Sequence, residues 1–177
     1  FWSALTIATT LKLPMLFYIE DNGYGISVPS HFQTPGGNIV KNLASFKGIK
    51  LVSGDGTNPE EAAELIQQAN EHVRLKRQPA LLRLTVPRLN GHSAQDTQSY
   101  KTEERIRFEQ QHDPLPKLKK FMLTHGLTNE TKWQAMENQA RDEVMRTYQK
   151  VDQQPFAEPA EVHTHAFAEK DENGKPV

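Results

Sequence analysis

Hydrophobic residues in the first half of the chain follow two spacings, one typical of helices and one typical of buried strands. Four apolar positions at helix spacing predict a helix over 1–12: Trp2, Leu5, Ala8 and Leu11. Three short apolar runs have the length of strands and end near polar residues or proline: 13–20, 49–53 and 80–86. Helix spacing returns between them, at 38–46 and 58–77. This alternation predicts an α/β fold, a parallel sheet covered by helices.

Beyond the third strand run the sequence becomes more polar. Residues 88–101 predict a loop, and helices are expected at 102–112, 114–126 and 128–152. The last of these is amphipathic, with an apolar stripe at Trp133, Met136, Ala140, Val144, Tyr148 and Val151. We therefore divide the chain into a partial three-layer parallel-sheet domain, a helical carboxyl-terminal extension and an extended tail or connector: 1–127, 128–152 and 153–177.

The amino-terminal residue falls inside a helical pattern. Phe1 is not a methionine, and no capping residue precedes the helix spacing that starts at Trp2. We therefore expect the chain to begin inside a helix, with upstream residues that belong to a longer protein.

Composition narrows the class of partner. The chain has 177 residues and a net charge of −1, from 21 Lys+Arg and 22 Asp+Glu, which favours neither nucleic acid nor a membrane surface as a partner. It contains no cysteine, so disulfides, thiolate metal sites and cysteine nucleophiles are excluded. No targeting or membrane-spanning pattern is visible. This composition fits a bacterial cytoplasm, with the mitochondrial matrix as the alternative.

Polar side chains follow the first and third strand runs. Asn22 and Tyr24 come directly after the first run, and His92 and Asp96 lie in the loop after the third. Loops that follow parallel strands emerge at one edge of a sheet, so we expect these two to face one another across a crevice. The side-chain oxygen of Asn22 suits Mg²⁺, although Asn22 followed by Gly23 also fits an ordinary turn.

Several spaced motifs stand along the chain: EDNGYGISVP at 20–29, QTPGG at 33–37, DGTNP at 55–59, NGHSAQDTQSYK at 90–101 and HDPL at 112–115. The first two resemble the second half of a cofactor fingerprint in the α subunit of thiamine diphosphate-dependent 2-oxo acid dehydrogenases, of the pyruvate and branched-chain type. The other three resemble later landmarks of the same family, in the same order. The resemblance covers residues 1 to about 126 and implies a partial thiamine diphosphate-binding domain.

The resemblance implies roles for five residues beside the cofactor. Asn22 would supply a side-chain oxygen to Mg²⁺, and Tyr24 would supply its backbone carbonyl oxygen. Gly25 would allow close approach of a flat ligand. Ile26 resembles the apolar residue that props thiamine diphosphate in its bent shape, and Ser27 would lie near the pyrimidine.

The resemblance also implies roles in the loop after the third strand. His92 would be the catalytic residue that reaches the cofactor diphosphate and the reacting centre. Arg88, Asp96 and Tyr100 resemble residues that order this loop. Ser93 stands where some family members are phosphorylated, and a phosphate there would place negative charge in a site that holds diphosphate and a 2-oxo acid.

The implied activity is that of the decarboxylating component of a 2-oxo acid dehydrogenase complex. That component oxidatively decarboxylates a 2-oxo acid and reductively acylates a lipoyl group. Its partners would be a β subunit or fused β half, a lipoyl-bearing acyltransferase component and a small 2-oxo acid. Two alternatives stay open: an acetoin dehydrogenase-type relative with the same cofactor, and an inert fragment that acts as a folded interaction piece.

Two parts of the family's site have no counterpart in this sequence. The Gly-Asp-Gly that opens the fingerprint would lie before Phe1, whereas the GDG at 54–56 follows Asn22 and matches a different landmark. The glutamate that activates the cofactor comes from the β part. We therefore expect the 177-residue chain alone to bind thiamine diphosphate and Mg²⁺ poorly.

In the tail, His163 and His165 are either two metal ligands or an incidental pair.

Overall fold

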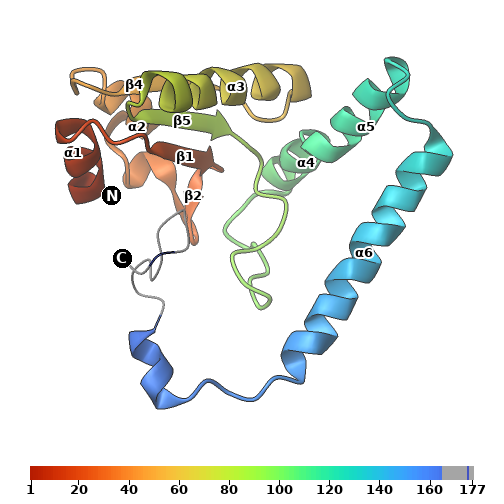
Figure 1. Cartoon of the computed structure of the whole chain (residues 1–177). Coiled ribbons are helices and arrows are strands. Elements are labelled where there is room, and N and C mark those ends of the chain that lie inside the picture. Colours follow the sequence, from red (N-terminus) through yellow and green to blue (C-terminus); the bar gives the residue numbers. More distant parts are fainter. Residues whose placement is uncertain (165–174, 176–177) are drawn as a thin grey trace. The chain divides into compact units, whose positions relative to one another are not determined.

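A computed structural model describes residues 1–164 and 175 (Figure 1). The chain separates into two compact units, Phe1–Asn129 and Glu130–Val177. All strands of the described residues belong to the first unit. The two segments expected to form the site, 20–29 and 88–101, lie in this unit as well.

The sheet of the first unit contains three parallel strands: β1 (Leu16–Asp21), β4 (Lys50–Asp55) and β5 (Ala80–Thr85). Their spatial order is β1-β5-β4, so β4 lies on the far side of β5 from β1. The first residues of all three strands are in register, and so are the last. The predicted parallel α/β arrangement is therefore confirmed, and the strands end level at one edge.

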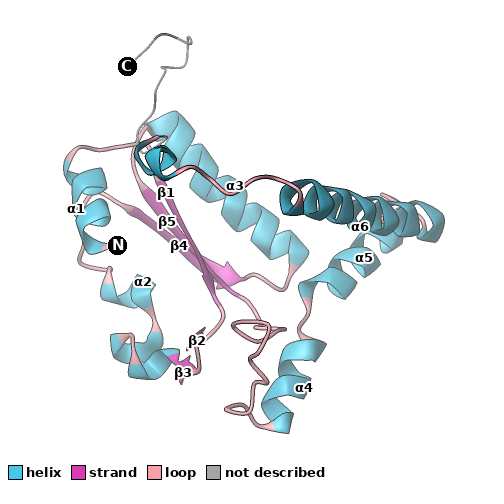
Figure 2. Ribbon diagram, turned by 90° about the horizontal axis from the view of Figure 1, so that it is seen from below, coloured by secondary structure: helices cyan, strands magenta, loops and turns pink. Residues whose placement is uncertain are grey.

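Helices cover both faces of this sheet (Figure 2). They are α1 (Trp2–Thr10) and α2 (Ile39–Asn42) on one face and α3 (Pro59–Lys76) on the other. Leu5 of α1 packs against Leu81 of β5, whereas Ala69 of α3 packs against Leu82. Successive strand residues point to opposite faces, so Leu81 and Leu82 belong to different halves of the core.

The segment that links the first strand run to the helix spacing at 38–46 contains local structure. A two-stranded antiparallel hairpin is formed by β2 (Tyr24–Gly25) and β3 (Val28–Pro29), and two 3₁₀ helices follow, η1 (Ser30–Phe32) and η2 (Pro35–Gly37). Hydrophobic spacing carries no signal for such short elements, because backbone and side-chain hydrogen bonds rather than burial hold them.

Two expected elements near the sheet differ from the prediction. The helix expected over 38–46 is the single turn α2, and the chain leaves it at Leu43, whose side chain is buried in the core. The first strand was expected to be buried from residue 13. It begins only at Leu16 and lies at the edge of the described sheet, where Tyr18 is 47% exposed.

Beyond the loop at 88–101 the described residues form the helices α4 (Glu103–Gln111), α5 (Pro114–Thr124) and α6 (Glu130–Asp152). In the stripe of α6, Trp133 is buried, whereas Val144 and Tyr148 are exposed. The tail was expected to be extended, but it contains a 3₁₀ helix, η3 (Pro159–His163). His165, the second member of the histidine pair, lies outside the described residues. None of the described helices is both long and apolar enough to cross a membrane.

Candidate active site at the carboxyl edge of the sheet

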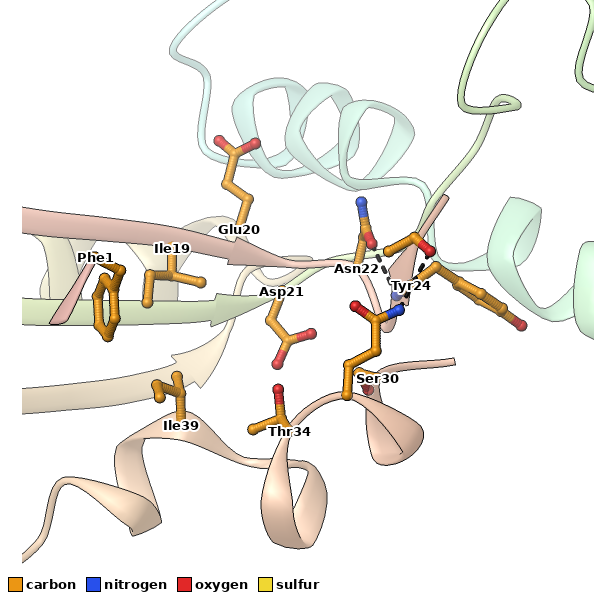
Figure 3. Close-up of a pocket in the computed structure, with 11 residues that line it drawn as sticks. Phe1, Ile19, Glu20, Asp21, Asn22, Tyr24, Ser30, Thr34 and Ile39 are labelled. Carbon is orange, nitrogen blue, oxygen red and sulfur yellow. Dashed lines mark hydrogen bonds between the residues drawn. The ribbon is translucent and has the colours of Figure 1, made fainter. Parts of the chain in front are cut away.

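Two successive side-chain turns follow β1. Oδ1 of Asp21 accepts a hydrogen bond from the Gly23 N–H at 3.1 Å, and Oδ1 of Asn22 accepts one from the Tyr24 N–H at 3.1 Å. Gly23 has a φ of +81°, a backbone angle that side-chain-bearing residues rarely adopt. Together these bonds bend the chain sharply where the strand ends (Figure 3).

The turn presents two oxygen atoms that suit a hard cation. The Asn22 amide oxygen has a second lone pair beyond the one used by Tyr24 N–H. The residue opposite Tyr24 in the hairpin is Pro29, which has no N–H to offer the Tyr24 carbonyl. The donor set therefore consists of one amide oxygen and one backbone carbonyl oxygen, which are ligand types that Mg²⁺ accepts.

The hairpin tip beyond this turn is held by side chains from elsewhere. Nε2 of Gln33 donates to the carbonyl oxygens of Gly25 and Val28, at 3.3 and 3.0 Å. A Cβ on Gly25 would lie 2.5 Å from the Gln33 amide. Ile26 has a φ of +56° and is 62% exposed, an uncommon conformation for a β-branched residue. Nη1 of Arg88 donates to the Ile26 carbonyl and so holds this strained tip.

The loop after β5 is organised around one carboxylate, that of Asp96. Its Oδ2 accepts hydrogen bonds from the His92 N–H at 2.7 Å and the Tyr100 hydroxyl at 2.9 Å. Its Oδ1 accepts a bond from the Gln98 N–H at 2.8 Å. Nη2 of Arg88 lies 4.0 Å from the same carboxylate. Asp96 therefore joins residues spread over the whole loop.

These contacts shift the acidity of both ends of the Asp96–Tyr100 pair. The backbone N–H groups of His92 and Gln98 lower the pKa of Asp96, with smaller contributions in the same direction from Tyr100 and Arg88. Burial raises the pKa of the Tyr100 hydroxyl, and its bond to Asp96 raises it further. Near neutral pH Asp96 is thus an acceptor and Tyr100 a donor, as their hydrogen bond requires.

A buried ionic cluster anchors the end of this loop to α4. Nζ of Lys101 donates to Oε2 of Glu109 at 2.6 Å and to the Arg88 carbonyl at 2.9 Å. Both side chains are almost fully buried, and Glu109 also accepts a bond from Arg105 Nε at 2.8 Å. The three cations Arg88, Lys101 and Arg105 lie 5.1 to 6.0 Å from the ring centre of Tyr24. The cluster therefore ties the second loop to the Asn22 turn.

The two loops border common space at the sheet edge. A cavity of about 410 Å³ is lined by Glu20 and Asn22 from the first loop and by residues 86–92, His92 included, from the second. A neighbouring cavity of about 350 Å³ is lined by Asn22, Tyr24 and Gly25 among others (Figure 3). The predicted crevice between the loops is therefore present, and Asn22 contributes to both cavities.

The other residues singled out in the sequence lie around this edge. Ile26 and Ser27 are exposed at the hairpin tip, and His92 and Ser93 are exposed in the second loop. The described residues hold no group of three or more His, Asp or Glu side chains placed to bind a metal ion.

Sequence reasoning missed several residues that shape the site. Gln33, Lys101 and Glu109 make the contacts described above, and Arg83 of β5 forms an ion pair with Asp21 at 2.7 Å. Only Arg83 carries a sequence signal, because it is a charged residue inside an apolar strand run. That signal does not identify a partner that lies many residues away.

Comparison with known proteins identifies the family of the chain. The chain belongs to the dehydrogenase E1 component family, whose model matches residues 1–160. It is 25% identical over 169 residues to the mitochondrial 2-oxoisovalerate dehydrogenase subunit alpha of Homo sapiens, a match that covers 94% of this chain and 38% of that protein. It is 28% identical over 166 residues to the pyruvate dehydrogenase E1 component subunit alpha of Rickettsia conorii, covering 94% and 51%.

A plant relative gives the same picture. The chain is 29% identical over 168 residues to the mitochondrial pyruvate dehydrogenase E1 component subunit alpha-1 of Arabidopsis thaliana, covering 94% of this chain and 42% of that protein. The resemblance to α subunits of the pyruvate and branched-chain type is therefore confirmed, and it extends past residue 126. The chain spans 38 to 51% of the length of these three relatives.

Proposed function

We propose that this chain is part of the α component of a thiamine diphosphate-dependent 2-oxo acid dehydrogenase and that its sheet edge binds the cofactor together with Mg²⁺. The observation that carries this proposal is the meeting of the Asn22 turn and the His92 loop at one cavity. The family match over residues 1–160 and the names of the relatives support it.

The residues present fit this cofactor and metal. Asn22 and the Tyr24 carbonyl would contribute two oxygen ligands to Mg²⁺, which usually takes few protein ligands and completes its shell with phosphate and water oxygens. Gly25, which has no side chain, would let a flat ring approach the backbone. The strained backbone at Ile26 agrees with a role in shaping a bound ligand, because strain of this kind clusters at functional sites. Ser27 would lie beside the same ring.

The second loop would contribute the groups that act on the substrate side. We propose that His92 faces the cofactor diphosphate and the reacting centre. Arg88, Asp96 and Tyr100 would keep the loop in place through the bonds to Asp96 and to the Ile26 carbonyl. Phosphorylation of Ser93 would inhibit by adding negative charge at the edge that binds diphosphate.

The reaction of the whole protein would be oxidative decarboxylation of a 2-oxo acid with reductive acylation of a lipoyl group. When bound, thiamine diphosphate supplies the nucleophile and the electron sink for this chemistry. The described residues would bind, orient and shield the site. A β subunit or β domain, and a lipoyl-bearing acyltransferase component, would be the partners.

The proposal is tested by binding to the full-length protein. Calorimetry should show thiamine diphosphate binding that depends on Mg²⁺. Asn22→Ala should weaken this binding at least about tenfold, because it removes a metal ligand and the partner of the Tyr24 N–H. Asn138→Ala, which removes an exposed amide from α6, is the matched control and should leave binding unchanged. Failure of the wild type to bind, with or without Mg²⁺, would overturn the proposal.

Turnover then defines the substrate. Pyruvate, branched-chain 2-oxo acids and acetoin should be assayed with the full-length protein and its β partner, and activity with acetoin alone would replace the 2-oxo acid assignment. We also propose that residues 1–177 by themselves bind the cofactor weakly, because the Asn22 turn offers only two of the oxygen ligands that Mg²⁺ requires. Tight, Mg²⁺-dependent binding by that segment would contradict this statement.

A further inference from the structure

Arg83 occupies an unusual position for a charged residue, in the middle of the central strand β5. Its Nε and Nη2 atoms each lie 2.7 Å from Oδ2 of Asp21 on β1, and its Nη1 donates to Oγ of Ser53 on β4 at 3.3 Å. The side chain is only 13% exposed. One guanidinium therefore contacts both neighbouring strands.

The register shows that this contact is directed toward the site. Ser53 is level with Arg83 in the sheet, and so is Ile19 on the other side. Asp21 lies two residues beyond Ile19, at the carboxyl edge where the turn begins. Arg83 thus slants toward that edge rather than bridging the strands at its own level.

The Asp21 carboxylate that Arg83 contacts also accepts a hydrogen bond within the turn. One oxygen of Asp21 receives the Arg83 guanidinium, and the other accepts the Gly23 N–H at 3.1 Å. Figure 3 shows Asp21 pointing toward Thr34 across the cavity, while Glu20 points to the opposite side of the strand. Gly23 is the residue with positive φ between Asn22 and Tyr24. The position of Asp21 therefore sets the path of the backbone that carries both proposed metal ligands.

We propose that Arg83 is a positioning residue for the Asn22 turn, acting through Asp21. It aims the Asp21 carboxylate at the Gly23 N–H, and it neutralises a negative charge that would otherwise stand free beside the metal site and compete for the cation. Charge-assisted bonds of this kind are stronger than neutral ones, so a single buried arginine suffices to hold the turn. The metal-binding part of this inference rests on the proposed function, whereas the hold on the turn does not.

Amide hydrogen exchange of the full-length protein without cofactor tests the hold directly. Arg83→Gln should speed exchange at the Gly23 and Tyr24 amides by about tenfold, since the bond from Gly23 loses its fixed acceptor. Arg83→Lys keeps the charge but loses the planar set of guanidinium N–H donors, so it should give an intermediate rise in the exchange rate. Ser53→Ala removes the third contact of Arg83 and is the control, which should leave these amides unchanged. The Ala80 amide, bonded to the Met15 carbonyl at the far end of the sheet, reports on the strands themselves.

Calorimetric binding of thiamine diphosphate at fixed Mg²⁺ is the second measurement. Arg83→Gln should weaken binding by about tenfold, and the double variant Asp21→Asn with Arg83→Gln should recover most of that loss, because an amide accepts the Gly23 N–H without leaving a charge. Equal acceleration at Gly23 and Ala80, or wild-type exchange and binding in Arg83→Gln, would overturn the proposal. If the wild type itself binds no cofactor, the proposed function fails, and the exchange data alone decide whether Arg83 holds the turn.

Discussion

The two loops that meet at the sheet edge are stabilised in different ways. The Asn22 turn is short, and its bonds join residues two positions apart, from Asp21 to Gly23 and from Asn22 to Tyr24. The loop after β5 spans more than ten residues and depends on a carboxylate, Asp96, and on a buried ionic cluster with α4.

This difference shows how each loop would fail. The turn combines neutral local bonds with the Arg83–Asp21 ion pair, so the loss of one neutral local bond should have a small, local effect. The second loop concentrates its bonds on a few charges, so the loss of one buried partner should release many residues at once. The predictions below test this contrast, in order of decreasing effect.

The largest effect is expected at Glu109. Glu109→Leu leaves Lys101 buried without its carboxylate, and breaking a buried pair in this way costs about 3–5 kcal/mol. Amide exchange in the full-length protein should show that the free energy needed to open the loop 88–101 falls by that amount. The Lys101 N–H should be among the affected groups. Glu103→Leu is the matched control on the same helix, because Glu103 is 90% exposed in its pair with Arg107. It should change stability by no more than about 1 kcal/mol. Similar effects of Glu109→Leu and Glu103→Leu would show that the loop after β5 does not depend on its buried charges.

The next effect is expected at Gly91. A Cβ built there lies 2.4 Å from the Asp96 carbonyl oxygen and 2.8 Å from its Cβ, so the backbone must move. Overpacking of this kind costs about 1–3 kcal/mol. Gly91→Ala should therefore speed exchange at the His92 amide, which bonds to Asp96. Unchanged exchange there would show that the loop absorbs a methyl group without losing the Asp96 contacts.

A smaller effect on the stability of the loop after β5 is expected when the pH is lowered. The pKa of Asp96 is lowered by the His92 and Gln98 N–H groups, so its contribution to loop stability is complete above the ordinary aspartate pKa of about 3.9. That contribution is lost only as the pH falls through the lower pKa that Asp96 has in the folded protein. Exchange at His92 and Gln98, corrected for its intrinsic pH dependence, should stay constant from neutral pH to about pH 4 and then rise. Asp96→Asn should remove this acid step, and a step that persisted would assign it to another group.

The smallest effect is expected at the hairpin tip. Gln33→Ala removes two bonds to the hairpin from a side chain that is itself exposed, a loss of about 0.5–1.5 kcal/mol in local stability. The affinity of the full-length protein for thiamine diphosphate should fall by less than about threefold. Gln67→Ala, which removes an exposed bond to Glu71 on α3, should have no effect on affinity. A tenfold loss for Gln33→Ala would mean that the hairpin tip depends on one residue, as the second loop does.

Features that depend on neighbours in sequence were predictable. Asn38 and Asn58 cap α2 and α3, each through bonds to backbone N–H groups two and three residues on, and asparagine is a residue type that favours this position. The turn at Asn22 and the parallel order of strands also followed from local pattern. The small hairpin at 24–29 was missed, because its two-residue strands are too short to show a period.

Features that depend on distant residues were not predictable. The apolar runs of β1 and β5 look alike, yet β5 is central and buried whereas β1 lies at an edge of the described sheet. Lys101 and Glu109 read as ordinary polar residues of a loop and a helix, and only their burial shows that they form one pair. Sequence spacing contains no information on which side chain of opposite charge will be nearest after folding.

The sequence by itself determined the order of helices and strands, the helix caps and the turn that bears Asn22, because each depends on residues only a few positions apart. The tertiary structure decided which strand lies in the centre, which loops share a cavity and which charge neutralises which. Arg83 meets Asp21, and Arg88 meets Ile26, across 62 positions of sequence in each case. Such contacts arise only when the sheet brings the ends of β1 and β5 side by side.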